Sequence, residues 1–209
     1  MTPRSLPRLA WVLAAGAGLL RVPFAAQRLW DHDSVQFALG VEAFDLAAHH
    51  PHPPGYPVYI AALKALDWLG VAPLHGMVAL SILGGMVGTG LMVLLTARLL
   101  GWEPEVPGQG VLGEPALGGG WSQEPLSGPA PPFAGGLLAG LLYATSPLLW
   151  FYGELPLVYA VEGGLSVAVA YGAVTMGVSR RHFVAASVVF ALAAGIRPST
   201  GVLLAPLFL

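Results

Sequence analysis

The sequence contains no cysteine, and only 10% of its 209 residues are charged. The lack of cysteine excludes disulfides and thiolate metal sites. A soluble domain carries about 25% charged residues, so this chain has too little polar surface to cover a water-soluble globule. Its net charge of −2 is also too small to indicate nucleic-acid binding.

Apolar residues make up 56% of the chain and occur in long runs. Runs at residues 9–26, 75–100, 133–151 and 157–178 are close to the length of about 20 residues that a spanning helix needs. The pattern predicts an all-α membrane protein, a polytopic transmembrane helix bundle with the lipid bilayer as its partner. A cleavable signal peptide is the alternative for the first run, because it too has a basic start and an apolar middle.

Composition divides the chain into three parts. Residues 1–100 hold the first span, a polar loop, a short apolar stretch at 58–70 that suits an interfacial helix, and the second span. Residues 101–132 are rich in Gly, Pro and Glu and predict a flexible cytoplasmic linker. Residues 133–209 predict further spans, with glycines four apart for close helix packing. Because the last run stops at Leu209 without a polar cap, we expect a chain truncated there.

Basic residues predict the orientation. Arg4 and Arg8 precede the first span, and Arg180 and Arg181 follow the run at 157–178. Both clusters fall on the cytoplasmic side under the positive-inside rule if the N-terminus is cytoplasmic. The predicted location is therefore the cell membrane, multi-pass, with the loop at residues 27–57 extracytoplasmic.

The extracytoplasmic loop begins with an acidic pair, Asp31 and Asp33. Two carboxylates spaced in this way can share a divalent cation, or one can act as a base that the other orients. The alternative is structural: Asp33 would cap a short amphipathic helix that starts at Ser34, with Gln36 as the reciprocal partner. The two interpretations are compatible, because a capping carboxylate is a fixed one.

The loop ends with a proline-rich segment, residues 49–57, that contains three histidines and Tyr56. Proline fixes the backbone dihedral φ, so this segment is stiff and its side chains are held in place. Three clustered histidines could bind a metal, but loop histidines are more often solvated, and we assign no metal ligand.

Two charged residues outside the loop are further candidates. Glu154 lies in the short turn between two predicted spans, on the extracytoplasmic side. Arg197 lies about 14 residues past Arg181-His182, and a helix of that length reaches only about 21 Å. Arg197 therefore either extends to the outer surface or is buried with a partner, and an arginine there would suit an anionic phosphate.

The loop resembles the first-loop signature of a known family. The residues that carry the likeness are Asp33-Ser34-x-Gln36-Phe37-Ala38, the string HPPGYP at 52–57, and the later Gly195-Ile196-Arg197-Pro198. In this order they are similar to the GT-C-type membrane glycosyltransferases, in particular the protein O-mannosyltransferase-like branch. The likeness covers nearly the whole chain except the linker.

The resemblance implies an enzyme that transfers a sugar from a polyprenyl-phosphate donor to a protein or lipid acceptor at the outer membrane face. By that resemblance Asp33, or Asp31, is the general base, and the other carboxylate orients the acceptor or holds a divalent cation. Arg197 would bind the donor phosphate. Four further residues complete the predicted site for the substrates: His52, Tyr56, Gln36 and Glu154.

Two departures from the family pattern bear on this prediction. Where relatives often carry an acid before Val-Tyr-Ala, this chain has Leu157, with Glu154 three residues earlier. Relatives also have more spans. The alternatives to an enzyme are a transporter-type membrane component and an inactive glycosyltransferase fragment, but the sequence has no internal repeat and few ionisable groups within its spans.

Overall fold

The computed structural model describes residues 5–29, 31–102 and 130–208, and the regular elements within these ranges are all helices. The predicted all-α class is confirmed. Arg4 and most of the predicted linker at 101–132 lie outside the described residues. The α-helices are α1 (Ser5–Arg21), α2 (His32–Glu42), α3 (Pro57–Trp68), α4 (Pro73–Leu99), α5 (Ala130–Thr145), α6 (Pro147–Tyr152), α7 (Tyr159–Thr175), α8 (Arg180–Ile196) and α9 (Pro198–Leu204).

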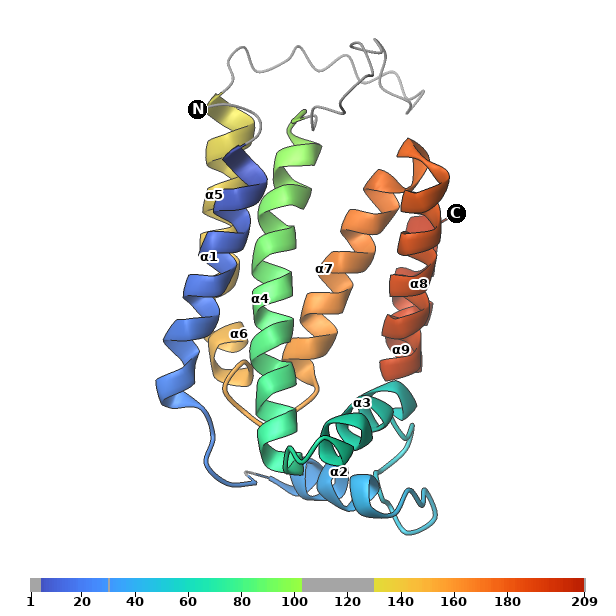
Figure 1. Ribbon diagram of the computed structural model, residues 1–209. Coiled ribbons are helices and arrows are strands. Elements are labelled where there is room, and N and C mark those ends of the chain that lie inside the picture. Colours follow the sequence, from blue (N-terminus) through green and yellow to red (C-terminus); the bar gives the residue numbers. More distant parts are fainter. Residues whose placement is uncertain (1–4, 30, 103–129, 209) are drawn as a thin grey trace.

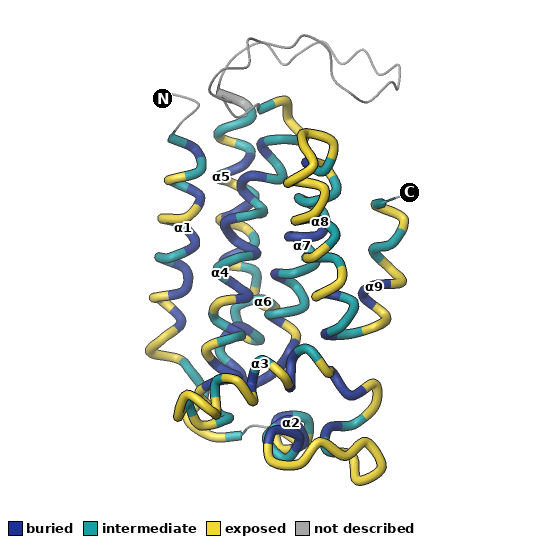
Figure 2. The backbone as a smooth tube through the Cα atoms, turned by 45° about the vertical axis from the view of Figure 1, so that its right-hand side comes forward, coloured by how far each residue is buried: buried dark blue, intermediate teal, exposed yellow. Residues whose placement is uncertain are grey.

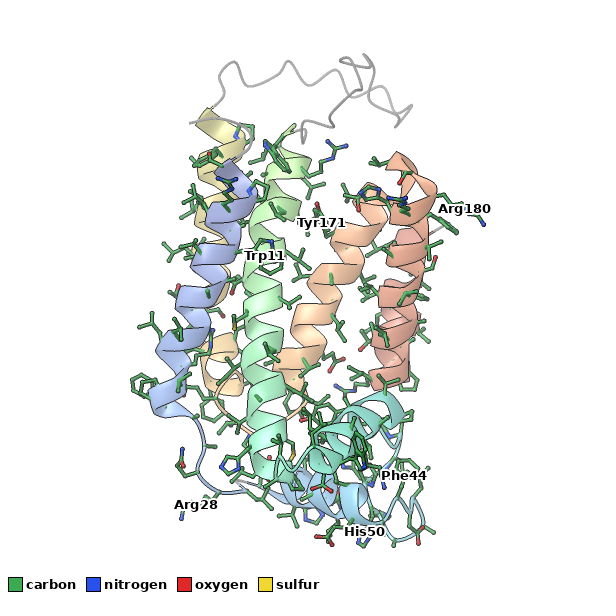
Figure 3. The ribbon with its side chains drawn as sticks, viewed as in Figure 1. Trp11, Arg28, Phe44, His50, Tyr171 and Arg180 are labelled. Atoms are coloured by element: carbon green, nitrogen blue, oxygen red, sulfur yellow. The ribbon has the colours of Figure 1, made fainter. Side chains whose placement is uncertain are left out.

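The long helices run side by side, and the loop elements close one end of them. Figure 1 shows α1, α4, α5, α7 and α8 roughly aligned, with α2 and α3 lying across the lower end. Arg180 lies at the opposite end, as Figure 3 shows, whereas His50 and Arg28 lie at the end that α2 and α3 close. The polar loop and the dibasic pair are thus separated by the length of the bundle.

Proline and serine set several of the helix boundaries. Helices α3, α4, α6 and α9 have proline in their first turn, where the missing N–H costs nothing. Pro147 separates α6 from α5, and Pro198 separates α9 from α8. The Ser179 hydroxyl caps α8 by accepting from the His182 N–H. The last apolar run is thus divided into two helices at Arg197 and Pro198.

Glycines allow the central helices to approach closely. A Cβ atom on Gly84 of α4 would lie 2.6 Å from the Ala160 carbonyl oxygen, and one on Gly164 of α7 would meet the Gly84 backbone. Gly136 of α5 lies equally close to the Val93 carbonyl of α4. The prediction that glycines four apart allow close helix packing is confirmed for Gly84 and Gly136, and Gly164 is a further such position. The α4–α7 contact also fixes the first turn of α7, which carries Glu162.

Two helices are long and apolar enough to cross a bilayer by length and composition, namely Pro73–Leu99 and Tyr159–Val178. Figure 2 shows buried and exposed positions alternating along the bundle helices, as for amphipathic packing. The exposed side of the bundle is nevertheless apolar. Its large exposed hydrophobic side chains include Trp11, Val12, Leu19 and Leu20 of α1, Leu138, Leu141 and Leu142 of α5, and Phe183, Val184, Val188 and Leu192 of α8.

Candidate functional site

Of the two aspartates at the start of α2, Asp31 caps the helix and Asp33 does not. Asp31 Oδ1 accepts from the Ser34 N–H at 3.0 Å, and the Asp31 N–H donates to Ser34 Oγ at 3.1 Å, which forms a reciprocal capping box. The interpretation that Asp33 caps a helix starting at Ser34 is therefore wrong. The helix begins at His32, because Ser34 rather than Gln36 supplies the reciprocal side chain.

This division predicts different stability effects for the two aspartates. Asp31→Ala should lower the free energy of unfolding by about 1 kcal/mol, since it removes an N-cap, whereas Asp31→Asn should preserve the cap. Asp33→Ala should have a smaller effect. Thermal unfolding of the purified variants measures the difference, and an equal loss in both alanine variants would contradict the assignment.

A chain of polar side chains connects α2 with the proline-rich segment. Gln36 Oε1 lies 2.7 Å from His52 Nδ1, and Gln36 Nε2 lies 2.8 Å from His32 Nε2. Because the amide oxygen only accepts, the proton of neutral His52 is on Nδ1. His52 Nε2 is then an acceptor for the Tyr56 hydroxyl, 3.1 Å away. Gln36 therefore sets the tautomer of His52 and orients it toward Tyr56.

Aromatic packing and backbone geometry hold this chain in place. Phe37 is 1% exposed and packs edge-on against Tyr56 and Tyr59. Gly55 adopts a φ of 92°, in the left-handed region that favours glycine. The expectation of a segment that fixes its side chains agrees with these contacts. His52 Nδ1 also lies 3.8 Å from an Asp33 carboxylate oxygen, so Asp33 and His52 lie next to each other.

A second polar cluster comes from the other half of the chain. Arg197 Nη1 donates to Glu162 Oε2 at 3.1 Å, and the Thr200 hydroxyl donates to Glu162 Oε1. The Arg197 side chain is 36% exposed and that of Glu162 is 20% exposed. Arg197 therefore has the partner that one interpretation expected, but its side chain is partly exposed rather than buried.

Sequence reasoning did not select Glu162. The residue lies in the first turn of α7, within an apolar run that the sequence assigns to a span. Its one sequence signal is that an acid inside such a run is costly and so more often functional. Leu157, at the position where relatives carry an acid, is 2% exposed in the hydrophobic core, and its carbonyl accepts from the Ser81 hydroxyl at 2.7 Å.

Tyr56, Phe37 of α2 and Ile196 next to Arg197 belong to one hydrophobic core, so the two polar clusters lie at the same end of the bundle. Burial raises the pKa of the Tyr56 hydroxyl, the charge of Arg197 lowers it, and the carboxylates of Asp33 and Glu162 raise it further. The Tyr159 side chain of α7 is likewise within reach of the charges of both Asp33 and Arg197. Residues more than 100 positions apart in the sequence therefore surround one region, between α2, α3 and the start of α7.

Packing of the α8–α9 turn against α3 accounts for this convergence. A Cβ atom on Gly195 would lie 2.5 Å from the Val58 side chain, so the residues before Arg197 contact the start of α3. Figure 1 shows the lower end of α8 directly above α3. The structure thus brings together five of the predicted site residues: Asp33, Gln36, His52, Tyr56 and Arg197.

Glu154 belongs to a different cluster, next to the end of α1. Its backbone carbonyl accepts from the Ala26 N–H at 2.9 Å, and its Oε1 atom is buried without a hydrogen-bond partner among the described residues. Burial raises the pKa of Glu154, and the nearby charge of Arg21 opposes that rise. Glu154 is therefore not among the predicted site residues that the structure brings together, and Glu162 is the carboxylate that pairs with Arg197.

The described residues contain no group of three or more His, Asp or Glu side chains placed to hold a metal ion. One carboxylate oxygen of Asp31 is committed to the cap of α2. Carboxylate, imidazole, phenol and guanidinium groups nevertheless lie around one region. This set can accept a proton from a hydroxyl and can stabilise an anion.

Comparisons with protein-family models, with curated proteins and with solved structures give no match to this chain.

Proposed function

We propose that the chain is a multi-pass membrane glycosyltransferase of the GT-C type that uses a polyprenyl-phosphate sugar donor and a protein or lipid acceptor at the outer membrane face. The observation that carries the proposal is that the Asp33–His52 pair and the Arg197–Glu162 pair lie at one end of the bundle, next to the hydrophobic core that contains Tyr56 and Ile196. A sugar transfer of this kind needs a base for the acceptor on one side and a cation for the leaving phosphate on the other.

The roles follow from the chemistry of each group. Asp33 accepts the proton of the acceptor hydroxyl, whose oxygen attacks the anomeric carbon of the sugar. The bond between that carbon and the phosphate oxygen breaks, and polyprenyl phosphate leaves as an anion. Arg197, a fixed guanidinium, stabilises the charge that develops on this phosphate. His52 and Tyr56, oriented by Gln36, line the sugar side of the site.

Three observations support a membrane location for this chemistry. Two helices have the length and composition of spans, and the outer faces of α1, α5 and α8 expose large apolar side chains. An apolar surface this extensive is typical of a lipid-facing protein. The site lies at the end of the bundle opposite to Arg180, as Figures 1 and 3 show, and the positive-inside rule makes that site end extracytoplasmic.

The test is sugar transfer by membranes that carry the protein. Membranes with the wild-type chain, supplied with labelled polyprenyl-phosphate mannose or glucose, should release polyprenyl phosphate and label an acceptor, and membranes without the chain should not. Reconstituted vesicles provide the comparison with a transporter. Solute flux without any sugar transfer would overturn the proposal, as would the absence of transfer with every donor.

A further inference from the structure

We infer that Glu162 is a built-in competitor of the anion that Arg197 binds, and that it weakens retention of the product phosphate; this inference rests on the proposed function. The Glu162 carboxylate pairs with the Arg197 guanidinium at 3.1 Å. An arriving phosphate therefore exchanges with Glu162 for the same cation. Glu162 is a residue that sets the affinity of the site for phosphate groups.

The hydrogen bonds of Glu162 make this exchange reversible. One carboxylate oxygen pairs with Arg197 and the other accepts from Thr200 on α9. When Arg197 turns to a phosphate, Thr200 still holds the carboxylate, so Glu162 stays close to the anion. Partly exposed ion pairs contribute little net free energy, and Arg197 is 36% exposed. The Arg197 guanidinium can therefore exchange Glu162 for a phosphate with only a small loss of free energy.

The charges of donor and product determine which of the two Glu162 repels more strongly. A polyprenyl-phosphate sugar is a phosphodiester with one negative charge, whereas the released polyprenyl phosphate is a monoester whose charge approaches two. A carboxylate beside Arg197 repels both, and it repels the more highly charged product more strongly. Glu162 thus favours release of the product over release of the donor.

Neighbouring groups do not duplicate this role. Asp33 lies on α2 beside His52, on the acceptor side of Tyr56. Glu42, at the end of α2, is exposed to solvent. Glu162 is the carboxylate that touches the guanidinium, so a change at this residue alone should alter phosphate affinity.

The experiment is calorimetric titration of the purified full chain, in detergent, with geranyl phosphate. Glu162→Gln removes the charge but keeps one oxygen for Arg197, and its amide NH2 can donate to the Thr200 hydroxyl. We expect it to bind geranyl phosphate about fivefold more tightly than wild type, the change expected for loss of a partly exposed charge pair. Glu162→Asp keeps the charge and should bind like wild type. Arg197→Gln should abolish binding.

A matched control separates this contact from the general field of the protein. Glu42→Gln makes the same substitution at an exposed carboxylate at the same end of the bundle, and should leave the affinity for geranyl phosphate unchanged. Geraniol, which lacks the phosphate, should not distinguish the variants.

Three results would overturn the inference: equal or weaker binding by Glu162→Gln, no binding by either wild type or Glu162→Gln, or binding that survives Arg197→Gln. Failure of the proposed function has a different signature. If Glu162→Gln tightens phosphate binding while membranes transfer no sugar, the competitor role stands and the glycosyltransferase assignment falls.

Discussion

Replacement of Asp33 by asparagine is expected to lower sugar transfer by about 10²–10⁴-fold, the contribution typical of a positioned general base. Asparagine has the shape of aspartate but cannot accept the proton of an acceptor hydroxyl. The fold should survive, because Asp31 rather than Asp33 forms the capping box of α2. The measurement is the initial rate of transfer from a labelled polyprenyl-phosphate sugar at saturating donor.

Two companion variants make this result specific to Asp33. Asp45→Asn alters an exposed carboxylate of the same loop that accepts from the Ala47 N–H at 2.9 Å, a role that asparagine can keep, so transfer should be unchanged. Asp31→Asn preserves the cap and removes only a charge. If transfer falls with Asp31→Asn and not with Asp33→Asn, the base is Asp31 and the role assigned to Asp33 is wrong.

Helix positions were predictable because they depend on local patterns. The apolar run at 75–100 corresponds to α4 (Pro73–Leu99), and the short stretch at 58–70 corresponds to α3 (Pro57–Trp68). Proline in the first turn of each helix and glycines four apart are signals that a few neighbouring residues are enough to recognise. Helix boundaries could therefore be predicted without knowledge of any tertiary contact.

The cap of α2 was mispredicted because two frames of the same local pattern compete. Asp33 with Gln36 matches the common acid-x-x-Gln spacing, whereas Asp31 with Ser34 is the pair that forms. The tertiary contact decides between them. Gln36 Oε1 bonds to His52, 16 residues away, and is therefore not available to the backbone at the start of the helix.

Glu162 could not be predicted either, because its role depends on a contact with a residue distant in the sequence. Its partner Arg197 is 35 residues distant, and no periodicity links the two. The sequence offered Glu154 because that acid lies in a polar turn, where an exposed charge is expected. Glu154 lies in the turn before α7 and near Arg21, whereas Glu162, in the first turn of α7, pairs with Arg197. Only packing of α7 against α4 and α8 determines which acid faces the site.

Arg21 is expected to be the most important single side chain for the stability of the described helices. It is 0% exposed, its Nη2 donates to the Ala144 carbonyl at 2.8 Å, and its guanidinium lies 5.1 Å from the centre of the Trp150 ring. Ala144 is in the last turn of α5, where carbonyls lack helical partners. The guanidinium thus joins the end of α1 to the junction between α5 and α6.

Arg21→Met should lower the free energy of unfolding by about 2–4 kcal/mol. Methionine fills much of the volume but leaves the Ala144 carbonyl buried without a donor, and it removes the cation beside Glu154. Without that cation, burial alone acts on the Glu154 carboxyl, so its pKa rises further and it stays neutral to a higher pH. Denaturant or thermal unfolding in lipid nanodiscs measures the loss.

The double variant separates the charge pair from the hydrogen bonds. If Arg21 and Glu154 are coupled, Arg21→Met combined with Glu154→Gln should destabilise by less than the sum of the two single changes. Arg28→Met, at an exposed arginine in the same connection, should stay within about 0.5 kcal/mol of wild type. Equal losses at Arg21 and Arg28 would show that burial of Arg21 does not stabilise the junction. A larger loss at Arg21 with full additivity would assign its effect to the Ala144 carbonyl alone.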